Sequence, residues 1–348
     1  MAEGEGQISQ MGQSNKVASS TWSEWWSYEG ISGPNFWGVI NPDWTLCTQG
    51  KYQSPIDIDP NVLLYDPNLR PLNFTPGNFF GDVINTGHDL TIYLRPTDEE
   101  NELPLITGGP LTYKYRLHRL IIHFGASDDR GSEHRIAGKA FPLEIQLVAY
   151  NDDLFLNINQ ASRSSFGIMV LSLLGQVHEP NSKLLETILQ VVPKLRYKDY
   201  SQSIPDLALG ELVPNTSHYI TYEGSLTHPG CQEVVTWIIL NKPFFVSTKQ
   251  LDVLRSIYKV DETKDRSKME NNFRPVKALN NRTVRTNIRP QQQKDIGSTQ
   301  HKTRRDKAID RTKRIGKLLQ ENVVQKRSSG PMKLKASSIH RAHKRALG

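Results

Sequence analysis

The stretch Tyr115-Arg116-Leu117-His118-Arg119-Leu120-Ile121-Ile122-His123-Phe124-Gly125 decides the fold, together with Leu143-Glu144-Ile145-Gln146-Leu147-Val148 shortly after it. Both alternate in the manner of β-strands, in which residues two apart face the same side of a sheet. Ile121 and His123 therefore share one face with Arg119. Glu144, Gln146 and Val148 share one face of the second strand. We expect two neighbouring strands that bring these side chains together.

The rest of the chain up to residue 288 continues this pattern, because short alternating runs are separated by Gly, Pro and Asn turns. Such spacing predicts a mainly β domain with a large central sheet. The runs cover residues 82–85, 91–94, 117–123, 145–150, 168–174, 234–240 and 243–247. Helical spacing is limited to 181–190, with Asn181 or Ser182 as a cap, and 248–256, with Thr248 as a cap.

Charge divides the chain unevenly. From Arg289 onward there are 17 Lys or Arg against 4 Asp or Glu, a net +13, so the total of +7 leaves about −6 for residues 1–288. We predict a disordered leader (1–24), one folded domain (25–288) and a basic, largely disordered tail (289–348), in which 306–320 has the spacing of a marginal helix. No stretch approaches the roughly eighteen apolar residues of a membrane span.

The tail contains no Trp, Tyr or Phe, so it lacks the stacking surfaces of a specific nucleic-acid binder. Two interpretations stay open for it. It is either a solvated basic segment or an attachment site for anionic lipid, acidic glycan or acidic protein.

A series of short motifs then points to a family. In chain order they are Trp26-Ser27-Tyr28, Gly33-Pro34, Trp37, Gln53-Ser54-Pro55-Ile56-Asp57-Ile58, Asn85-Thr86-Gly87-His88, Gly108-Gly109-Pro110-Leu111, Gly131-Ser132-Glu133-His134, Tyr222-Glu223-Gly224-Ser225-Leu226-Thr227, Thr236-Trp237, Phe273-Arg274-Pro275 and Leu279-Asn280-Asn281-Arg282. Their order and spacing resemble those of the α-carbonic anhydrases over about residues 25–288. The resemblance implies a mixed, mostly antiparallel sheet of about ten strands, short surface helices and a conical pocket that reaches the sheet.

The zinc-binding positions depart from the family pattern. There the motif reads F-H-F-H-W-G, then G-S-E-H, then E-L-H-L-V, and three imidazoles hold zinc. This chain has Ile121, His123 and Gln146 at those positions. It therefore resembles the acatalytic carbonic anhydrase-related proteins, most closely the X/XI type, and zinc is expected to be absent or weakly bound, with no other cofactor. His123 is either a hydrogen-bonded core histidine or a lone, weak ligand.

Other residues match supporting positions of the family. Glu133 and Thr227 match a relay that orients zinc-bound hydroxide, and His88 matches the proton shuttle. Without metal, Glu133 and Thr227 can simply bond each other, and His88 can be an exposed loop histidine. Arg119 replaces the usual Gln and either pairs with a nearby acceptor or binds a small anion. The expected pocket residues are Arg119, Glu144, Val148, Val170, Leu226, His228 and Trp237. Glu144 and His134 match positions that orient ligands or brace the core in the family.

The two cysteines bear on the compartment. Cys47 and Cys231 match a disulfide of extracellular family members, and the alternative is two buried free thiols. Sequons begin at Asn73, Asn215 and Asn281, which adds a little weight to secretion. Residues 1–20 lack the apolar core of a secretory signal, so cytoplasmic location is the alternative to secretion.

Three functional interpretations follow. The first is a catalytically inactive protein-binding module, extracellular or at the neuronal cell surface, whose partner is a cell-surface protein. The second is a zinc-dependent carbonate dehydratase with an unorthodox or residual metal site. Positions 121 and 146 distinguish these two, and both favour the first. The third makes the basic tail the functional part and the domain its carrier.

Overall fold

A large β-sheet carries the domain in the computed structural model, which describes residues 25–98, 102–179, 183–208, 213, 217–264 and 266–289. The predicted leader, the predicted tail beyond Arg289 and the predicted helix at 306–320 lie outside these residues. Ten strands follow one another across the 13-stranded sheet in the order β11-β4-β5-β7-β9-β10-β13-β12-β15-β2, and β3, β6 and β14 join it off this path.

The strands have these bounds: β2 (Leu64–Tyr65), β3 (Leu72–Phe74), β4 (Asn78–Asn85), β5 (Leu90–Pro96), β6 (Leu105–Gly108), β7 (Tyr115–Phe124), β9 (Leu143–Asn151), β10 (Ile168–Val177), β11 (Ser201–Ala208), β12 (Tyr219–Gly224), β13 (Val235–Leu240), β14 (Phe244–Val246) and β15 (Arg285–Thr286). A separate parallel pair joins β1 (Asp57–Ile58) to β8 (Arg135–Ile136). Within the described sheet, β10 is parallel to β13 and β14, and β15 is parallel to β2. The other pairs are antiparallel, so the prediction of a mixed, mostly antiparallel sheet is confirmed.

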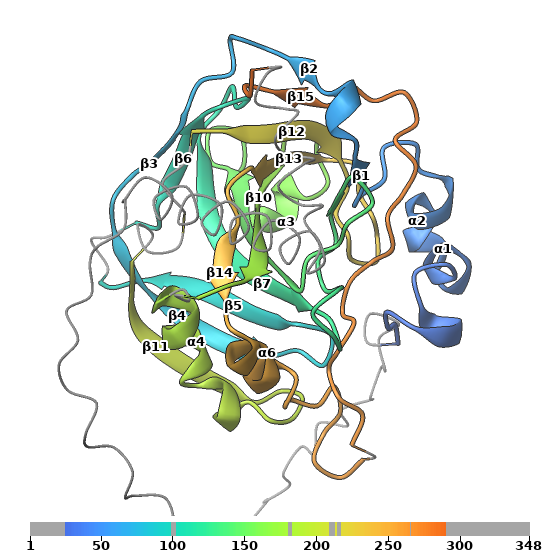
Figure 1. Cartoon of the computed structure of the whole chain (residues 1–348), viewed down its shortest axis with the longest axis vertical. Helices are drawn as coiled ribbons and strands as arrows, with labels where there is room; N and C mark the ends of the chain where they lie inside the picture. The colour runs from blue at the N-terminus through green and yellow to red at the C-terminus, as the bar shows by residue number, and fades with distance from the viewer. Residues whose placement is uncertain are drawn as a thin grey trace, which may run out of the picture. The chain divides into compact units, whose positions relative to one another are not determined.

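Each of the seven predicted runs coincides with a strand, and most of the strands extend a few residues further than the run. The two ends of the sheet differ in the helices that lie beside them. Figure 1 shows β12, β13, β15 and β2 at one end and β4 and β11 at the other, where α4 (Lys183–Leu189) and α6 (Thr248–Leu254) lie together.

The two predicted helices are α4 and α6, both shorter than their patterns. For α6 the predicted cap was wrong by one residue. Ser247 is the N-cap, because its hydroxyl accepts from the Gln250 N–H while the Gln250 side chain accepts from the Ser247 N–H, which satisfies two donors at once. The other helices among the described residues are single turns: α1 (Trp37–Ile40), α2 (Leu46–Gln49), α3 (Ile158–Ala161), and 3-10 turns at Gly30–Ser32, Pro42–Trp44, Pro60–Val62 and Val192–Lys194.

Alternation along the central strands separates two cores. On β7, Leu120 and Ile122 belong to the larger apolar cluster, whereas Ile121 between them belongs to a second cluster on the opposite face. On β9, Leu147 and Val148 divide in the same way. The face of the sheet that carries Ile121 and Val148 is called the site face below. None of the described helices has the length and apolar character needed to cross a membrane.

Candidate functional site

The pairing of β7 with β9 brings the three zinc-position residues together. Ile121 lies opposite Gln146, and His123 lies opposite Glu144. On the other side of β7, strand β5 places Thr91 opposite Ile121. Alternation in the sequence therefore predicted the neighbours correctly, and what they can do depends on their contacts.

Ile121 is part of an apolar cluster rather than a polar centre. It is 3% exposed and shares its cluster with Val148, Val170 and Trp237, against which the partly buried Leu226 packs. An aliphatic side chain has no lone pair to offer a metal ion. The first zinc position has thus become part of the hydrophobic core.

Gln146 bridges two buried carboxylates. Its amide nitrogen donates to Glu133 Oε2 at 2.8 Å and to Glu144 Oε1 at 3.0 Å. All three side chains are essentially buried. Because only the NH₂ group can donate to carboxylates, these two bonds determine which way the amide points. A neutral amide therefore stabilises two buried anions that would otherwise need a cation or other donors.

Glu144 is the best-satisfied of these anions. It also accepts from the His134 main-chain N–H at 2.9 Å, from His134 Nδ1 at 2.9 Å and from the Ser172 hydroxyl at 2.8 Å. Burial alone would raise the pKa of Glu144, but the charge and hydrogen bonds of His134 outweigh burial and lower that pKa well below its usual range. The network continues from His134 Nε2 to the Tyr222 hydroxyl, 2.8 Å away. All the hydrogen bonds of this network are made between protein groups.

His123 is fully buried and bonded on one side only. Nδ1 lies 2.6 Å from the carbonyl oxygen of Asn272, to which it donates, since a carbonyl can only accept. Nε2 lies 3.7 Å from Glu133 Oε2 and has no hydrogen-bond partner among the described residues. Burial lowers the pKa of His123, but Glu133 and the Asn272 carbonyl outweigh it and raise that pKa overall. His123 is thus a core histidine with one free ring nitrogen.

The relay residues are not joined to each other. Glu133 accepts from Gln146 and, on Oε1, from the main-chain N–H of Arg274 at 3.0 Å. Across the described residues, no hydrogen bond connects Glu133 to Thr227, although both are buried. Glu133 therefore finds its partners without the hydroxyl that we expected to serve it.

His88 is not an exposed loop histidine. Its ring stacks on Trp26 with centroids 3.8 Å apart and an interplanar angle of 10°. Burial lowers the pKa of His88 to about 4, although Asp89 opposes the shift. A ring that stays neutral at physiological pH does not exchange protons efficiently near pH 7, as a shuttle must.

Sequence reasoning missed Asp89, a buried carboxylate that lies beside Thr91 and His228. It accepts from the Thr91 hydroxyl at 2.7 Å and from His228 Nε2 at 3.0 Å. The sequence signal was a carboxylate directly after the Asn85–His88 motif, but its main partner, His228, lies 139 residues away. The predicted pocket residue His228 thus serves to hold Asp89.

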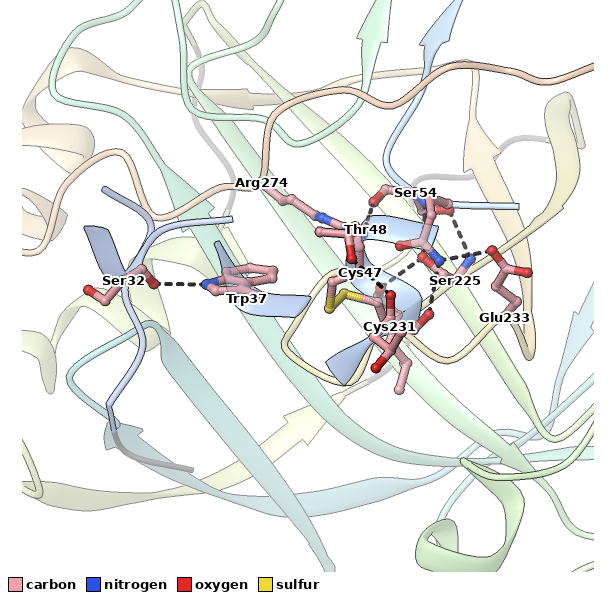
Figure 2. Close-up of a disulfide and its surroundings, with 12 residues drawn as sticks. Ser32, Trp37, Cys47, Thr48, Ser54, Ser225, Cys231, Glu233 and Arg274 are labelled. Atoms are coloured by element: carbon pink, nitrogen blue, oxygen red, sulfur yellow. Dashed lines mark hydrogen bonds between the residues drawn. A yellow bond between two sulfur atoms is a disulfide. The ribbon is translucent and has the colours of Figure 1, made fainter. Parts of the chain in front are cut away.

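The predicted disulfide is confirmed, since Cys47 and Cys231 are bonded with Cα atoms 5.0 Å apart (Figure 2). The side chain of Arg274 donates to the carbonyls of Ser54 at 2.8 Å and Cys47 at 3.1 Å. Gln53 Nε2 donates to the Cys231 carbonyl at 3.1 Å. The bridge therefore joins two segments that are also held by buried hydrogen bonds.

The residues present do not fit a catalytic zinc centre. Ile121 supplies no donor, the Gln146 amide is committed to two carboxylates, and His123 alone offers a free ring nitrogen. In the part of the chain that the structure describes, no group of three or more His, Cys, Asp or Glu is arranged to hold a metal ion.

The fold and these residues define a class. Residues 32–288 match the model of the eukaryotic-type carbonic anhydrases, so the chain belongs to that family. Among curated proteins it is 40% identical to carbonic anhydrase-like protein 2 of Caenorhabditis elegans, over 78% of this chain and 80% of that protein. It is 33% identical to carbonic anhydrase-like protein 1 of the same organism, over 76% of this chain and 90% of that protein. These names agree with a carbonic anhydrase-related protein.

Proposed function

We propose that this chain is a catalytically inactive carbonic anhydrase-related protein that acts as a protein-binding module. The observation that carries the proposal is the state of the zinc positions. Ile121 packs into an apolar cluster and the Gln146 amide bridges Glu133 and Glu144. Hydration of carbon dioxide by this family needs three imidazoles and a metal-bound water. Here one imidazole remains.

The same network explains why supporting residues persist without catalysis. Glu144, His134 and Ser172 satisfy one another inside the core. Removing one partner of such a network leaves a buried charge or donor unpaired, which is costly for stability. Retention of Glu133 and Glu144 therefore agrees with a structural role and requires no enzyme.

We further propose that the protein works outside the cell, at neuronal surfaces, bound to a cell-surface protein. The Cys47–Cys231 bridge supports an oxidising compartment, because disulfides are rare in the cytosol. Two sequons present exposed asparagines, Asn73 and Asn281. The neuronal assignment and the kind of partner rest on the resemblance to the X/XI type.

The test uses the full chain, purified from a secretory expression host with its disulfide intact. Labelled protein is applied to live neurons and to fibroblasts, and saturable binding is measured before and after trypsin treatment of the cells. We expect saturable, trypsin-sensitive binding to neurons and no hydration of carbon dioxide above buffer. Binding that does not saturate or survives trypsin contradicts a protein partner, and measurable hydration contradicts the inactive assignment.

A further inference from the structure

Three stretches of the chain lie side by side next to the end of β4 and form a surface apart from the site face. The Tyr258 N–H donates to the Arg196 carbonyl at 2.8 Å, and Tyr258 forms an antiparallel bridge with Lys268. Asn85, the buried last residue of β4, donates from its side chain to the Tyr258 carbonyl at 2.9 Å. Ile257 is buried in the larger apolar cluster, so this surface is anchored away from the zinc positions.

Aromatic rings and a guanidinium are stacked on this surface. The Tyr197 and Tyr258 rings have centroids 5.5 Å apart and an interplanar angle of 17°. The Arg196 guanidinium lies 5.4 Å from the Tyr258 centroid and 5.9 Å from the Tyr197 centroid. Directly opposed residues of an antiparallel bridge project to the same side, so Lys268 stands beside Tyr258. The stacked guanidinium is held in place before any partner arrives, which lowers the entropy cost of binding.

Three cations converge on the hydroxyl of Tyr258. Arg196 lowers the pKa of this hydroxyl most, and the charges of Arg266 and Lys268 lower that pKa further. All three cations are exposed, and among the described residues none of them forms an ion pair with a carboxylate. Because residues 1–288 carry about −6 in total, this local positive charge is opposite in sign to the rest of the domain.

The carboxylates nearby in the sequence have other partners. Asp261 pairs with Lys264 at 2.9 Å, and Glu262 accepts from the Tyr200 hydroxyl at 2.9 Å. Asp199 is exposed beside them. Negative charges interspersed among the cations repel a uniformly sulfated glycan, whereas a peptide can carry acidic side chains only where the cations stand. The charge pattern therefore favours a peptide segment over a glycan.

We propose that Arg196, Tyr258, Arg266 and Lys268, called the Tyr258 surface below, bind an acidic segment of the cell-surface protein partner. Carboxylates of the segment pair with the three cations, and an adjoining apolar side chain packs on the partly exposed ring of Tyr258. Tyrosine and arginine are the side chains that most often dominate the binding energy of such interfaces. This inference rests on the proposed function and deepens it by naming the binding face and the charge of the partner.

The first experiment locates the contact on the full chain by carbodiimide cross-linking to a hexaglutamate peptide, followed by peptide mapping. The reagent couples carboxylates to lysine amines that they contact, and mapping separates Lys268 from the lysines of the basic tail. We expect conjugation of Lys268 to saturate at a lower peptide concentration than conjugation of Lys242, which is exposed elsewhere on the domain. High salt should weaken this preference, because exposed charges are screened.

Charge-reversal variants test whether neighbouring cations attract the peptide to Lys268. Arg196→Glu should reduce the conjugation of Lys268 about fivefold, because a repulsive charge replaces an attractive one. Arg163→Glu is the matched control, since Arg163 is also exposed, and it should leave the conjugation of Lys268 unchanged. Equal conjugation in Arg196→Glu and the natural chain, or no preference for Lys268 over Lys242, overturns the proposal.

The second experiment measures saturable binding of the same full-length proteins to neurons. The double variant Arg196→Glu with Lys268→Glu should bind about tenfold more weakly than the natural chain. The control pair Arg163→Glu with Lys242→Glu changes the net charge equally and should bind as the natural chain does. Melting temperatures equal to that of the natural chain show that the variants are folded.

The outcomes separate this inference from the proposed function. Equal neuronal binding by the natural chain and the folded Arg196→Glu, Lys268→Glu variant overturns the Tyr258 surface alone. Loss of binding by the natural chain after heparinase treatment of the neurons identifies a sulfated glycan and overturns the acidic-peptide assignment. Absence of neuronal binding by the natural chain contradicts the proposed function, and the cross-linking result then decides whether the Tyr258 surface binds acidic peptide.

Discussion

Replacing Gln146 by Leu tests whether this amide is a structural replacement for a zinc ligand. Leucine has a similar size but cannot donate, so Glu133 and Glu144 each lose one bond, of 2.8 Å and 3.0 Å respectively. Hydrogen bonds to charged groups contribute about 1.5–3 kcal/mol each, and the extra apolar burial of leucine offsets about 1 kcal/mol. The variant should therefore lose about 2–5 kcal/mol of unfolding free energy.

The assay is urea unfolding followed by tryptophan fluorescence, with the disulfide intact and equal m-values required for the comparison. Gln176→Leu on β10 is the matched control, because Gln176 is partly exposed and makes no side-chain hydrogen bond with described residues. This control substitution should change the free energy of unfolding by less than about 0.5 kcal/mol. Gln146→His, with a single N–H in its neutral form, should fall between the natural chain and Gln146→Leu. A loss below about 1 kcal/mol in Gln146→Leu refutes the bridging role.

Three further predictions concern other parts of the chain. Replacing Cys47 and Cys231 by Ser opens a loop that spans a sequence separation of 184. The loop-entropy model predicts that the free energy of unfolding, measured in urea, falls by at most about 5 kcal/mol. An unchanged free energy of unfolding would mean that the bridge does not constrain the unfolded chain. The pKa of His88 is about 4 in the folded chain, below its ordinary 6.5, so the unfolded chain takes up the proton first as the pH falls. The free energy of unfolding is therefore full above pH 6.5 and decreases by about 2–3 kcal/mol toward pH 4. His88→Phe should flatten this part of the pH profile, and an unchanged slope would contradict the burial of His88. Truncation after Ile288 removes a net charge of +13 and should abolish retention on heparin at low salt with the melting temperature nearly unchanged; a drop of more than a few degrees would show that the tail packs on the domain.

Much of the sheet could be predicted because its signals are local. Alternation in 115–125 and 143–148 identified β7 and β9 as strands, and the structure adds the register that places Ile121 opposite Gln146. Family motifs supplied what alternation could not, namely the disulfide between residues that are 184 positions apart. Both kinds of information depend on residue types at regular spacing.

The missed features depend on irregular or long-range geometry. The bulge on β7 between Leu117 and Arg119 shifts the alternation by one residue, so that Leu117 and Leu120, three positions apart, both face the larger core. The Asp89–His228 contact joins segments 139 residues apart, and the Ser247 cap was missed because Ser and Thr are both good N-caps and stand next to each other. The direction of the Gln146 amide follows from two carboxylates on different segments, which no single stretch reveals.

Zinc content is the most direct measure of the central claim. Elemental analysis of the natural chain, purified without chelator in zinc-supplemented medium, should give well under one zinc per chain. The double variant Ile121→His with Gln146→His completes three imidazoles with His123, on strands that already pair these positions, and should bind close to one zinc per chain. One zinc per natural chain, together with carbon dioxide hydration, would contradict the assignment as an inactive member of the family.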